Sequence, residues 1–197
     1  KAEQDKADEI NTCIGCNQAC LDHVFKRKIA SCLVNPRACH ETELVYLPTN
    51  APKKVAVVGA GPAGMAFSTV AAQRGHQVTL FDSSAEIGGQ FNIAKQIPGK
   101  EEFYETIRYF NKKIENTKVN LKLNTRVGPG DLKEFDIVIL STGIKPRELS
   151  IDGINHSKVM NYLDVLKDKK EVGKKVAIIG AGGIGFDVAE FLTHKGE

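Results

Sequence analysis

The chain has 197 residues, of which 42% are hydrophobic and 26% are charged. This composition is ordinary for a soluble globular protein, and the length is sufficient to bury a hydrophobic core. The net charge is only +3, and the lysines and arginines are interspersed among acidic residues, which excludes a strongly basic surface. We therefore expect neither nucleic acid nor a membrane as a partner.

Residues 55–73 contain no charged side chain and could in principle cross a bilayer. However, three glycines and a proline fall between positions 59 and 64, and a strand, a turn and a helix explain that pattern better. Residues 1–10 are polar and charged and lack the apolar core of a signal peptide. We expect no membrane span and no export signal in these two segments.

All five cysteines lie within the first 39 residues, at Cys13, Cys16, Cys20, Cys32 and Cys39. This clustering is unlike a secreted disulfide framework and favours a metal site in a reducing compartment, for which we expect the cytoplasm. The first four follow the spacing C-x2-C-x3-C-x11-C. Thiolates suit iron–sulfur clusters or zinc, and the three-plus-one grouping favours a [4Fe–4S] cluster held by Cys13, Cys16, Cys20 and Cys32.

Alternatives to this cluster are open. Zinc is the main one, although structural zinc sites usually contain two separated pairs of ligands. The thiols could also be reduced cysteines without any metal. Gly15, inside the first C-x2-C, can adopt the backbone conformation of a tight chelating loop. Because a cubane needs four ligands, we expect Cys39 to be a small buried residue near the site.

The rest of the chain predicts alternating strands and helices, which indicate a parallel sheet of the α/β class. Residues 41–53 contain two prolines and predict an irregular connector. Strands are predicted at 54–58, 77–82, 119–123, 135–141 and 175–179. Helices are predicted after the turn at 59–64, ending near position 74, and at 101–116 and 186–193.

The first glycine turn has the pattern of a dinucleotide-binding unit, G-x-G-x-x-G between a strand and a helix. Gly59 makes the tight turn, Gly61 lets the backbone approach a pyrophosphate, and Gly64 lets the helix pack closely on the strand. The pyrophosphate would lie at the helix N-terminus, where free N–H groups favour anions. Asp82, 23 residues after Gly59, is placed to accept hydrogen bonds from ribose hydroxyls, although it could also be a solvated strand end.

Three segments together resemble the FAD-binding half of pyridine-nucleotide-dependent flavoproteins. They are Pro62-Ala63-Gly64, the run from Glu86 to Gln90 that contains Gly88 and Gly89, and Ser141-Thr142-Gly143. Thr142 and Gly143 end a strand where such folds bring the chain back over the first turn. The resemblance implies FAD at this turn.

A second glycine turn, Gly180-Ala-Gly182-Gly-Ile-Gly185, repeats the first pattern after the strand predicted at 175–179. It predicts a pyrophosphate site for a nicotinamide nucleotide; the alternative is a turn kept for helix–strand packing alone. The residue that selects NAD or NADP follows the next strand. By the spacing of the first unit it would be position 203, which lies beyond Glu197.

The cysteine segment narrows the resemblance. The run from Cys13 to Cys20, the run from Ser31 to Glu41 and the run from Gly88 to Phe103 resemble the iron–sulfur flavoenzymes of the old yellow enzyme superfamily. They are most similar to the bacterial NADPH-dependent 2,4-dienoyl-CoA reductases. The resemblance covers nearly the whole chain.

That resemblance implies a longer protein, with an N-terminal (β/α)8 barrel that carries FMN and binds the dienoyl-CoA substrate. It implies electron transfer from NADPH through FAD, the cluster and FMN to the substrate. This chain then comprises an iron–sulfur segment at 1–50, part of a Rossmann-like FAD domain at 51–150, and a linker with the start of an NAD(P) domain at 151–197. It implies no acid–base catalyst in this chain. The implied FAD contacts are Ala63, Asp82, Gln90, Lys100 and Val127, of which Lys100 could be merely solvated.

Three other functions are weighed against this one. A related NADH oxidase or enoate reductase would use the same cofactors. A disulfide-reducing flavoprotein would need a cysteine pair near the flavin, but no cysteine follows Cys39 in this sequence. A zinc-stabilised binding module would contain no iron.

Overall fold

The structure is a computed structural model and describes residues 1–194. Its centre is a sheet of four parallel strands in the order β3-β2-β1-β4. The strands are β1 (Lys54–Val58), β2 (Gln77–Phe81), β3 (Asn120–Lys122) and β4 (Ile137–Leu140). The predicted fold class, an α/β protein with a parallel sheet, is confirmed.

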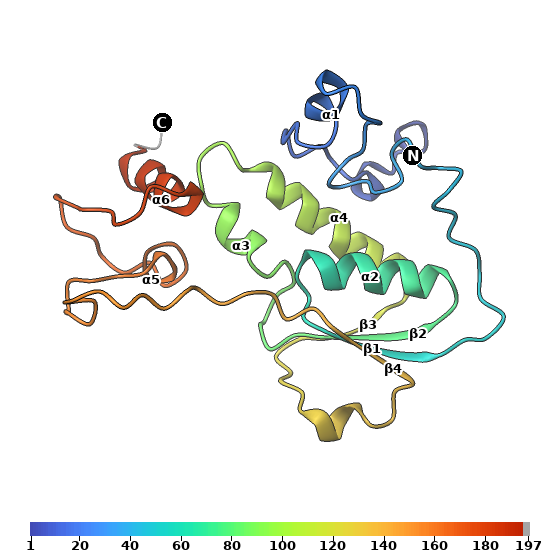
Figure 1. Cartoon of the computed structure of the whole chain (residues 1–197). Coiled ribbons are helices and arrows are strands. Elements are labelled where there is room, and N and C mark those ends of the chain that lie inside the picture. The colour runs from blue at the N-terminus through green and yellow to red at the C-terminus, as the bar shows by residue number, and fades with distance from the viewer. Residues whose placement is uncertain (195–197) are drawn as a thin grey trace.

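Two helices cover one face of the sheet (Figure 1), α2 (Pro62–Gln73) and α4 (Glu102–Thr117). The core lies between them and the strands, where alternate residues of each strand point at the helices. Val57, Leu80 and Met65 are fully buried there, and Ile114 contributes from α4. The apolar positions that share one face of α4 thus form the buried side of an amphipathic helix.

The strand order positions the functional site. From β1 the chain passes to β2 and β3 on one side, then crosses to β4, which pairs with β1 on the other side. In open parallel sheets, ligands bind at the carboxyl ends of the strands where the order reverses in this way. That point lies at the end of β1, where the first glycine turn begins.

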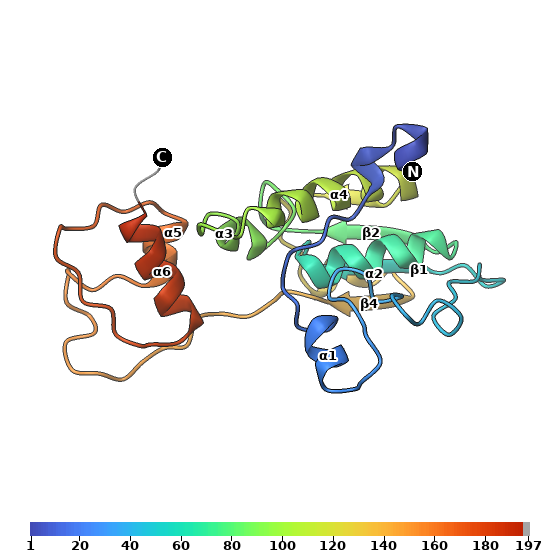
Figure 2. The ribbon, with the colours of Figure 1, turned by 90° about the horizontal axis from the view of Figure 1, so that it is seen from above.

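Several elements were not predicted. They are η1 (Ala2–Gln4), η2 (Ala7–Glu9), α1 (Leu21–Phe25), α3 (Phe91–Ala94), η3 (Pro129–Leu132) and α5 (Tyr162–Leu166). From β4 the chain runs as an extended stretch to α5 and then to α6 (Gly183–Thr193), as Figures 1 and 2 show. A second apolar cluster joins α5 and α6 to the loop after α3, through Leu166, Val188 and Ile97.

The prediction of a strand at 175–179 is wrong for this chain. Residues 176–180 have no regular secondary structure, and Val176, Ile178 and Ile179 are between 42% and 75% exposed. A strand needs a neighbour for its N–H and C=O groups, and the described residues 1–194 provide none at this place. The strands predicted at 119–123 and 135–141 form only over their central residues.

The predicted membrane alternative is also resolved. Residues 55–73 fold as β1, the glycine turn and α2, and within residues 1–194 no helix combines the length and apolarity that a bilayer crossing requires.

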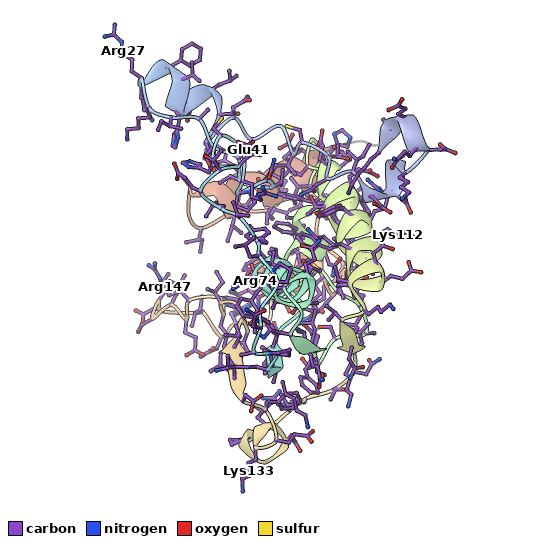
Figure 3. The ribbon with its side chains drawn as sticks, turned by 90° about the vertical axis from the view of Figure 1, so that its right-hand side faces the viewer. Arg27, Glu41, Arg74, Lys112, Lys133 and Arg147 are labelled. Carbon is purple, nitrogen blue, oxygen red and sulfur yellow. The ribbon has the colours of Figure 1, made fainter. Side chains whose placement is uncertain are left out.

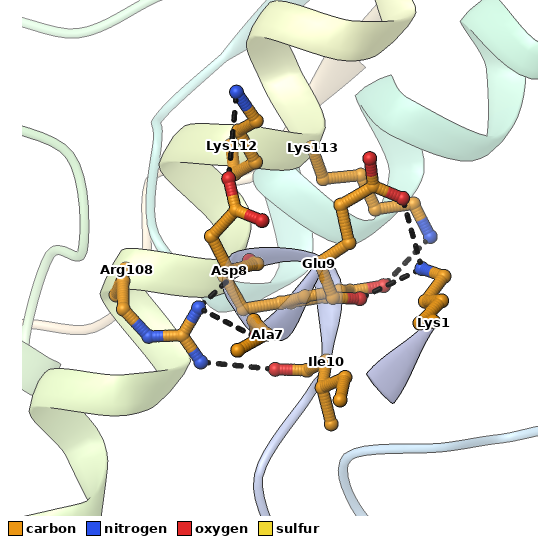
Figure 4. Close-up of polar contacts among 9 residues, drawn as sticks. Lys1, Ala7, Asp8, Glu9, Ile10, Arg108, Lys112 and Lys113 are labelled. Carbon is orange, nitrogen blue, oxygen red and sulfur yellow. Dashed lines mark hydrogen bonds and ion pairs between the residues drawn. The ribbon is translucent and has the colours of Figure 1, made fainter. Parts of the chain in front are cut away.

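The N-terminal residues are fixed on α4, although the sequence predicted only a polar lead-in. The guanidinium of Arg108 donates to the backbone carbonyl oxygens of Asp8 at 2.7 Å and Ile10 at 3.0 Å, and more weakly to that of Ala7 (Figure 4). Lys112 forms an ion pair with Asp8 at 3.4 Å. The chain that leads into the cysteine segment is therefore attached to the helix that covers the sheet.

We predict that Arg108→Met releases this attachment. Loss of one charge-assisted hydrogen bond, about 1.5 kcal/mol, corresponds to about tenfold faster local opening. Hydrogen exchange of the amides at 4–10 should accelerate by at least that factor, while exchange in β1 stays unchanged. Arg147→Met is the control, because Arg147 points outward from the extended stretch after β4 (Figure 3). Equal exchange at 4–10 in both variants would contradict the prediction.

Candidate functional site

The first glycine turn has three glycines with three different reasons. Gly59 has a φ of +108°, and a Cβ there would lie 2.3 Å from the carbonyl oxygen of Ser141. Gly64 is buried, and its Cβ would lie 1.9 Å from the carbonyl oxygen of Gly59. Gly61 has an ordinary φ of −75°, and nothing lies within 4 Å of the position of its Cβ. The fold itself therefore requires Gly59 and Gly64, whereas Gly61 leaves open space above the start of α2.

The chain after β4 returns over this turn, as predicted. The Ser141 hydroxyl donates toward the carbonyl oxygens of Gly59 at 2.9 Å and Val58 at 3.0 Å. This position was missed as a structural contributor, because its role depends on β4 lying beside β1. Thr142 and Gly143 follow at the open side of the turn, and Gly143 has a φ of +76°.

The segment with the second glycine pair closes another side of the turn. The Gly88 N–H donates to the Ala60 carbonyl at 2.9 Å, and Gly89 lies against the Cα of Gly61. The Gln90 amide donates to the carbonyl of Ile144 at 3.2 Å. The predicted residues Gly61, Gly89, Gln90 and Gly143 thus come together around the N-terminus of α2, together with Pro62 and the exposed Ala63 on its first turn.

Asp82 lies at the end of β2, beside the turn. One carboxylate oxygen accepts the Ala60 N–H at 2.6 Å and the other accepts the Ser84 N–H at 2.7 Å. A carboxylate has about four acceptor positions, so two N–H donors leave capacity for hydroxyls. Val127 lines a surface hollow next to Phe81 and Thr125, and the Thr125 N–H donates to the Asp82 carbonyl. The adenosine contacts of Asp82 and Val127 stay predictions.

The second glycine turn repeats the geometry of the first. Gly180 has a φ of +114°, and a Cβ at Gly185 would lie 2.3 Å from the Gly180 carbonyl oxygen. Gly182 begins α6 with a φ of −86°, and the position of its Cβ is open for 4 Å. The turn therefore forms although the strand before it is unpaired, and its middle glycine again faces free space.

Lys100 has a protein partner that the sequence did not indicate. Its Nζ lies 2.7 Å from both carboxylate oxygens of Asp187, on the second turn of α6. The lysine is therefore not merely solvated. A lysine ammonium has three donors, so one remains, and the predicted FAD contact stays a prediction.

The cysteine segment is irregular except for the short helix α1. Gly15 has a φ of +63°, as expected for a tight loop, and its N–H donates to the Cys13 sulfur at 3.4 Å. Cys16, Cys20 and Cys32 are partly buried and Cys13 is exposed. Cys39 is exposed rather than buried, because it lies in a turn with a φ of +62°.

The cysteine segment provides donors that suit a cluster, but it does not hold them as a formed metal site. Over residues 1–194 no group of three or more histidine, cysteine, aspartate or glutamate side chains is arranged to hold a metal ion. Four free thiols within one segment match the soft ligands of iron–sulfur chemistry. The ligand set Cys13, Cys16, Cys20 and Cys32 stays a prediction.

Shifts in pKa accompany ion pairs at the surface. The Glu115 carboxylate, and then Asp8, raise the pKa of Lys112 through hydrogen bonds and charge. Lys170 and the Asn161 N–H lower the pKa of Asp164, and that carboxylate raises the pKa of Lys170. These pairs fix the N-terminal segment and the start of α5 rather than the glycine turns.

Comparison with known proteins identifies the family. A family model described as pyridine nucleotide-disulphide oxidoreductase matches residues 53–197, which is most of the chain. The chain belongs to this family. Its domain binds FAD and NAD(P), in agreement with the two glycine turns. Disulfide exchange beside the flavin would need a cysteine pair, which this sequence lacks after Cys39.

Relatives extend the similarity to the N-terminal segment. A metal reductase from Desulforamulus reducens is 37% identical over 202 residues, and a cinnamate reductase from Clostridium sporogenes is 36% identical over 200 residues. Both alignments cover 100% of this chain and 30% of the relative. A solved 2-naphthoyl-CoA reductase in complex with 2-naphthoyl-CoA has 38% identity and a TM-score of 0.92, covering 98% of this chain and 30% of that one. The chain thus spans under a third of the length of these oxidoreductases.

We predict that Gly61→Val and Gly64→Ala fail in opposite ways. In the complete protein, Gly61→Val should leave the unfolding temperature of the FAD-free form unchanged, because its Cβ meets no protein atom within 4 Å. It should nevertheless abolish FAD retention, measured by flavin absorbance. Gly64→Ala should lower the unfolding temperature of the same form, because its Cβ would overlap the Gly59 carbonyl. A destabilised Gly61→Val protein, or one that retains FAD, would contradict the interpretation of the turn.

Proposed function

We propose that this chain is the electron-transfer portion of an NADPH-dependent flavin and iron–sulfur reductase that acts on unsaturated acyl-CoA thioesters, of the 2,4-dienoyl-CoA reductase kind. The observation that carries the proposal is the repeated turn. In each copy the middle glycine, Gly61 or Gly182, faces open space at a helix N-terminus, while the outer glycines are explained by the fold. Two such turns in one chain match two dinucleotides used together, FAD at the first and NADPH at the second.

The residues around the first turn would hold FAD in a defined way. Backbone N–H groups at the start of α2 would bind the pyrophosphate, and the free acceptors of Asp82 would bind the ribose. Gln90, Gly143 and the chain between them would lie along the cofactor. When bound, FAD takes a hydride from the nicotinamide, and an iron–sulfur cluster carries electrons singly.

The substrate class rests on what the relatives act on. The 2-naphthoyl-CoA reductase, which aligns with nearly the whole chain, takes an acyl-CoA thioester. The cinnamate reductase favours a second candidate, reduction of a free unsaturated acid by the same cofactors, and an NADH oxidase would be a further variant. In either case we propose that FMN and the substrate site belong to a barrel outside these residues, in a cytoplasmic protein.

We propose that Cys13, Cys16, Cys20 and Cys32 hold the cluster. The Gly15 N–H that reaches the Cys13 sulfur would stabilise a thiolate there. Cys39 lies on an exposed turn, and its N–H is held by the Glu41 carboxylate at 3.2 Å. That geometry fits a residue outside the cluster.

The cysteines are tested one at a time in the complete protein. Cys16→Ser and Cys32→Ser should abolish the broad visible absorbance and the bound iron, because each removes a ligand. Cys39→Ser is the matched control and should keep both. Zinc in place of iron, or iron lost on changing Cys39 alone, would contradict the assignment.

The second turn is tested by Gly182→Val. The branched side chain would occupy the space where the backbone must meet the nucleotide pyrophosphate, so flavin reduction by NADPH in stopped flow should lose saturation. FAD content should stay normal, because the first turn is untouched. Normal reduction and saturation in this variant would place the nucleotide elsewhere. NADH in place of NADPH tests which nucleotide the complete protein uses.

A further inference from the structure

The ion pair between Lys100 and Asp187 joins the two halves of the site. Lys100 lies in the loop between α3 and α4, in the part of the chain that follows Gly89 and Gln90. Asp187 lies on α6, which begins at the second glycine turn. Both carboxylate oxygens are 2.7 Å from the same ammonium, and the two side chains are only 38% and 28% exposed. A charge-assisted pair with this geometry restricts direction as well as distance.

The pair is supported by apolar packing on the same side of α6. Val188, the next residue, is 9% exposed and packs with Ile97 and Leu166 in the second apolar cluster. The Lys100 N–H donates to the Ile97 carbonyl at 3.0 Å, so the loop that carries the lysine is fixed to the cluster. Two adjacent residues of α6 are thus attached to one loop, by charge and by burial, which fixes the helix against rolling.

The position of Asp187 along α6 gives the pair a functional consequence. It is the fifth residue of the helix, about 7 Å along the axis from the N-terminus. A helix N-terminus attracts the nucleotide pyrophosphate, and a carboxylate so close to it would oppose that attraction. Lys100 neutralises the carboxylate and at the same time holds the start of α6 in one direction relative to the first turn.

We infer that Asp187 is a positioning residue for hydride transfer, which orients the nicotinamide-nucleotide turn toward the flavin through Lys100. The inference rests on the proposed function, since it assigns NADPH to the second turn and FAD to the first. Asp187 itself touches neither cofactor in this role. Its effect on the reaction passes through the placement of α6.

The test compares Asp187→Asn with Glu190→Gln in the complete protein. Both remove one negative charge from the same helix, but Glu190 is exposed. In stopped flow, Asp187→Asn should slow the limiting rate of flavin reduction by about tenfold to a hundredfold, the range expected when reacting groups are misplaced by about 1 Å. Its Kd for NADPH should not rise, because a negative charge near the phosphates has been removed. Glu190→Gln should leave the limiting rate unchanged.

Lys100→Met tests the other side of the pair. It should slow the limiting rate similarly, but it should raise the Kd for NADPH, because the Asp187 charge is then uncompensated. Lys100→Arg should restore the rate, since a guanidinium can bind both carboxylate oxygens. Hydrogen exchange of the amides at 187–193 should accelerate in Asp187→Asn and Lys100→Met only, which is a readout independent of turnover.

The outcomes separate this inference from the proposed function. If Asp187→Asn reduces its flavin as fast as Glu190→Gln, the positioning role is wrong while the nucleotide site stands. If NADPH and NADH both fail to reduce the flavin of the unmodified protein, the proposed function itself is wrong. If Lys100→Met falls in rate with no change in Kd and Lys100→Arg does not recover, Lys100 acts without Asp187, and the inference fails.

Discussion

The contact between the backbone of Gly59 and the Cα of Gly64 determines the rest of the arrangement. It brings the first turn of α2 so close to the end of β1 that even a methyl group at position 64 would meet a carbonyl oxygen at 1.9 Å. The free N–H groups at the start of α2 therefore point across the end of the sheet, where β2 and β4 diverge from β1. Asp82 and the chain after Ser141 reach this place because their strands flank β1.

Local pattern and spacing predicted this part of the structure well. The bounds of β1 were predicted to the residue, and those of β2 and α4 to within one residue, because buried parallel strands and an amphipathic helix have strong periodic signals. The glycine turn was predictable for a similar reason, since its conformation is determined by residues within a few positions. The return of the chain after β4 over the turn followed from the family resemblance rather than from any local pattern.

Contacts between distant positions were not predictable from the sequence. Arg108 binds carbonyl oxygens about a hundred positions earlier, and any exposed arginine of an amphipathic helix would have looked the same. Lys100 and Asp187 are 87 positions apart, and neither belongs to a motif. The strand predicted at 175–179 failed for a related reason: its apolar pattern is a local property, whereas a strand exists only when another strand supplies hydrogen-bond partners. The division of the chain near positions 50 and 150 stays a prediction.

The two turns also separate stability from binding in a way that matters for the chemistry. In each turn the outer glycines satisfy the fold, while the middle glycine contributes nothing to packing. Cofactor affinity can therefore vary at the middle position without a loss of the core. The relative placement of the two turns depends instead on the second apolar cluster and on one ion pair. Such a connection is much smaller than the core beneath the sheet. Hydride transfer is sensitive to displacements of about 1 Å, so the geometry of the reaction depends on this small connection more than on the large core.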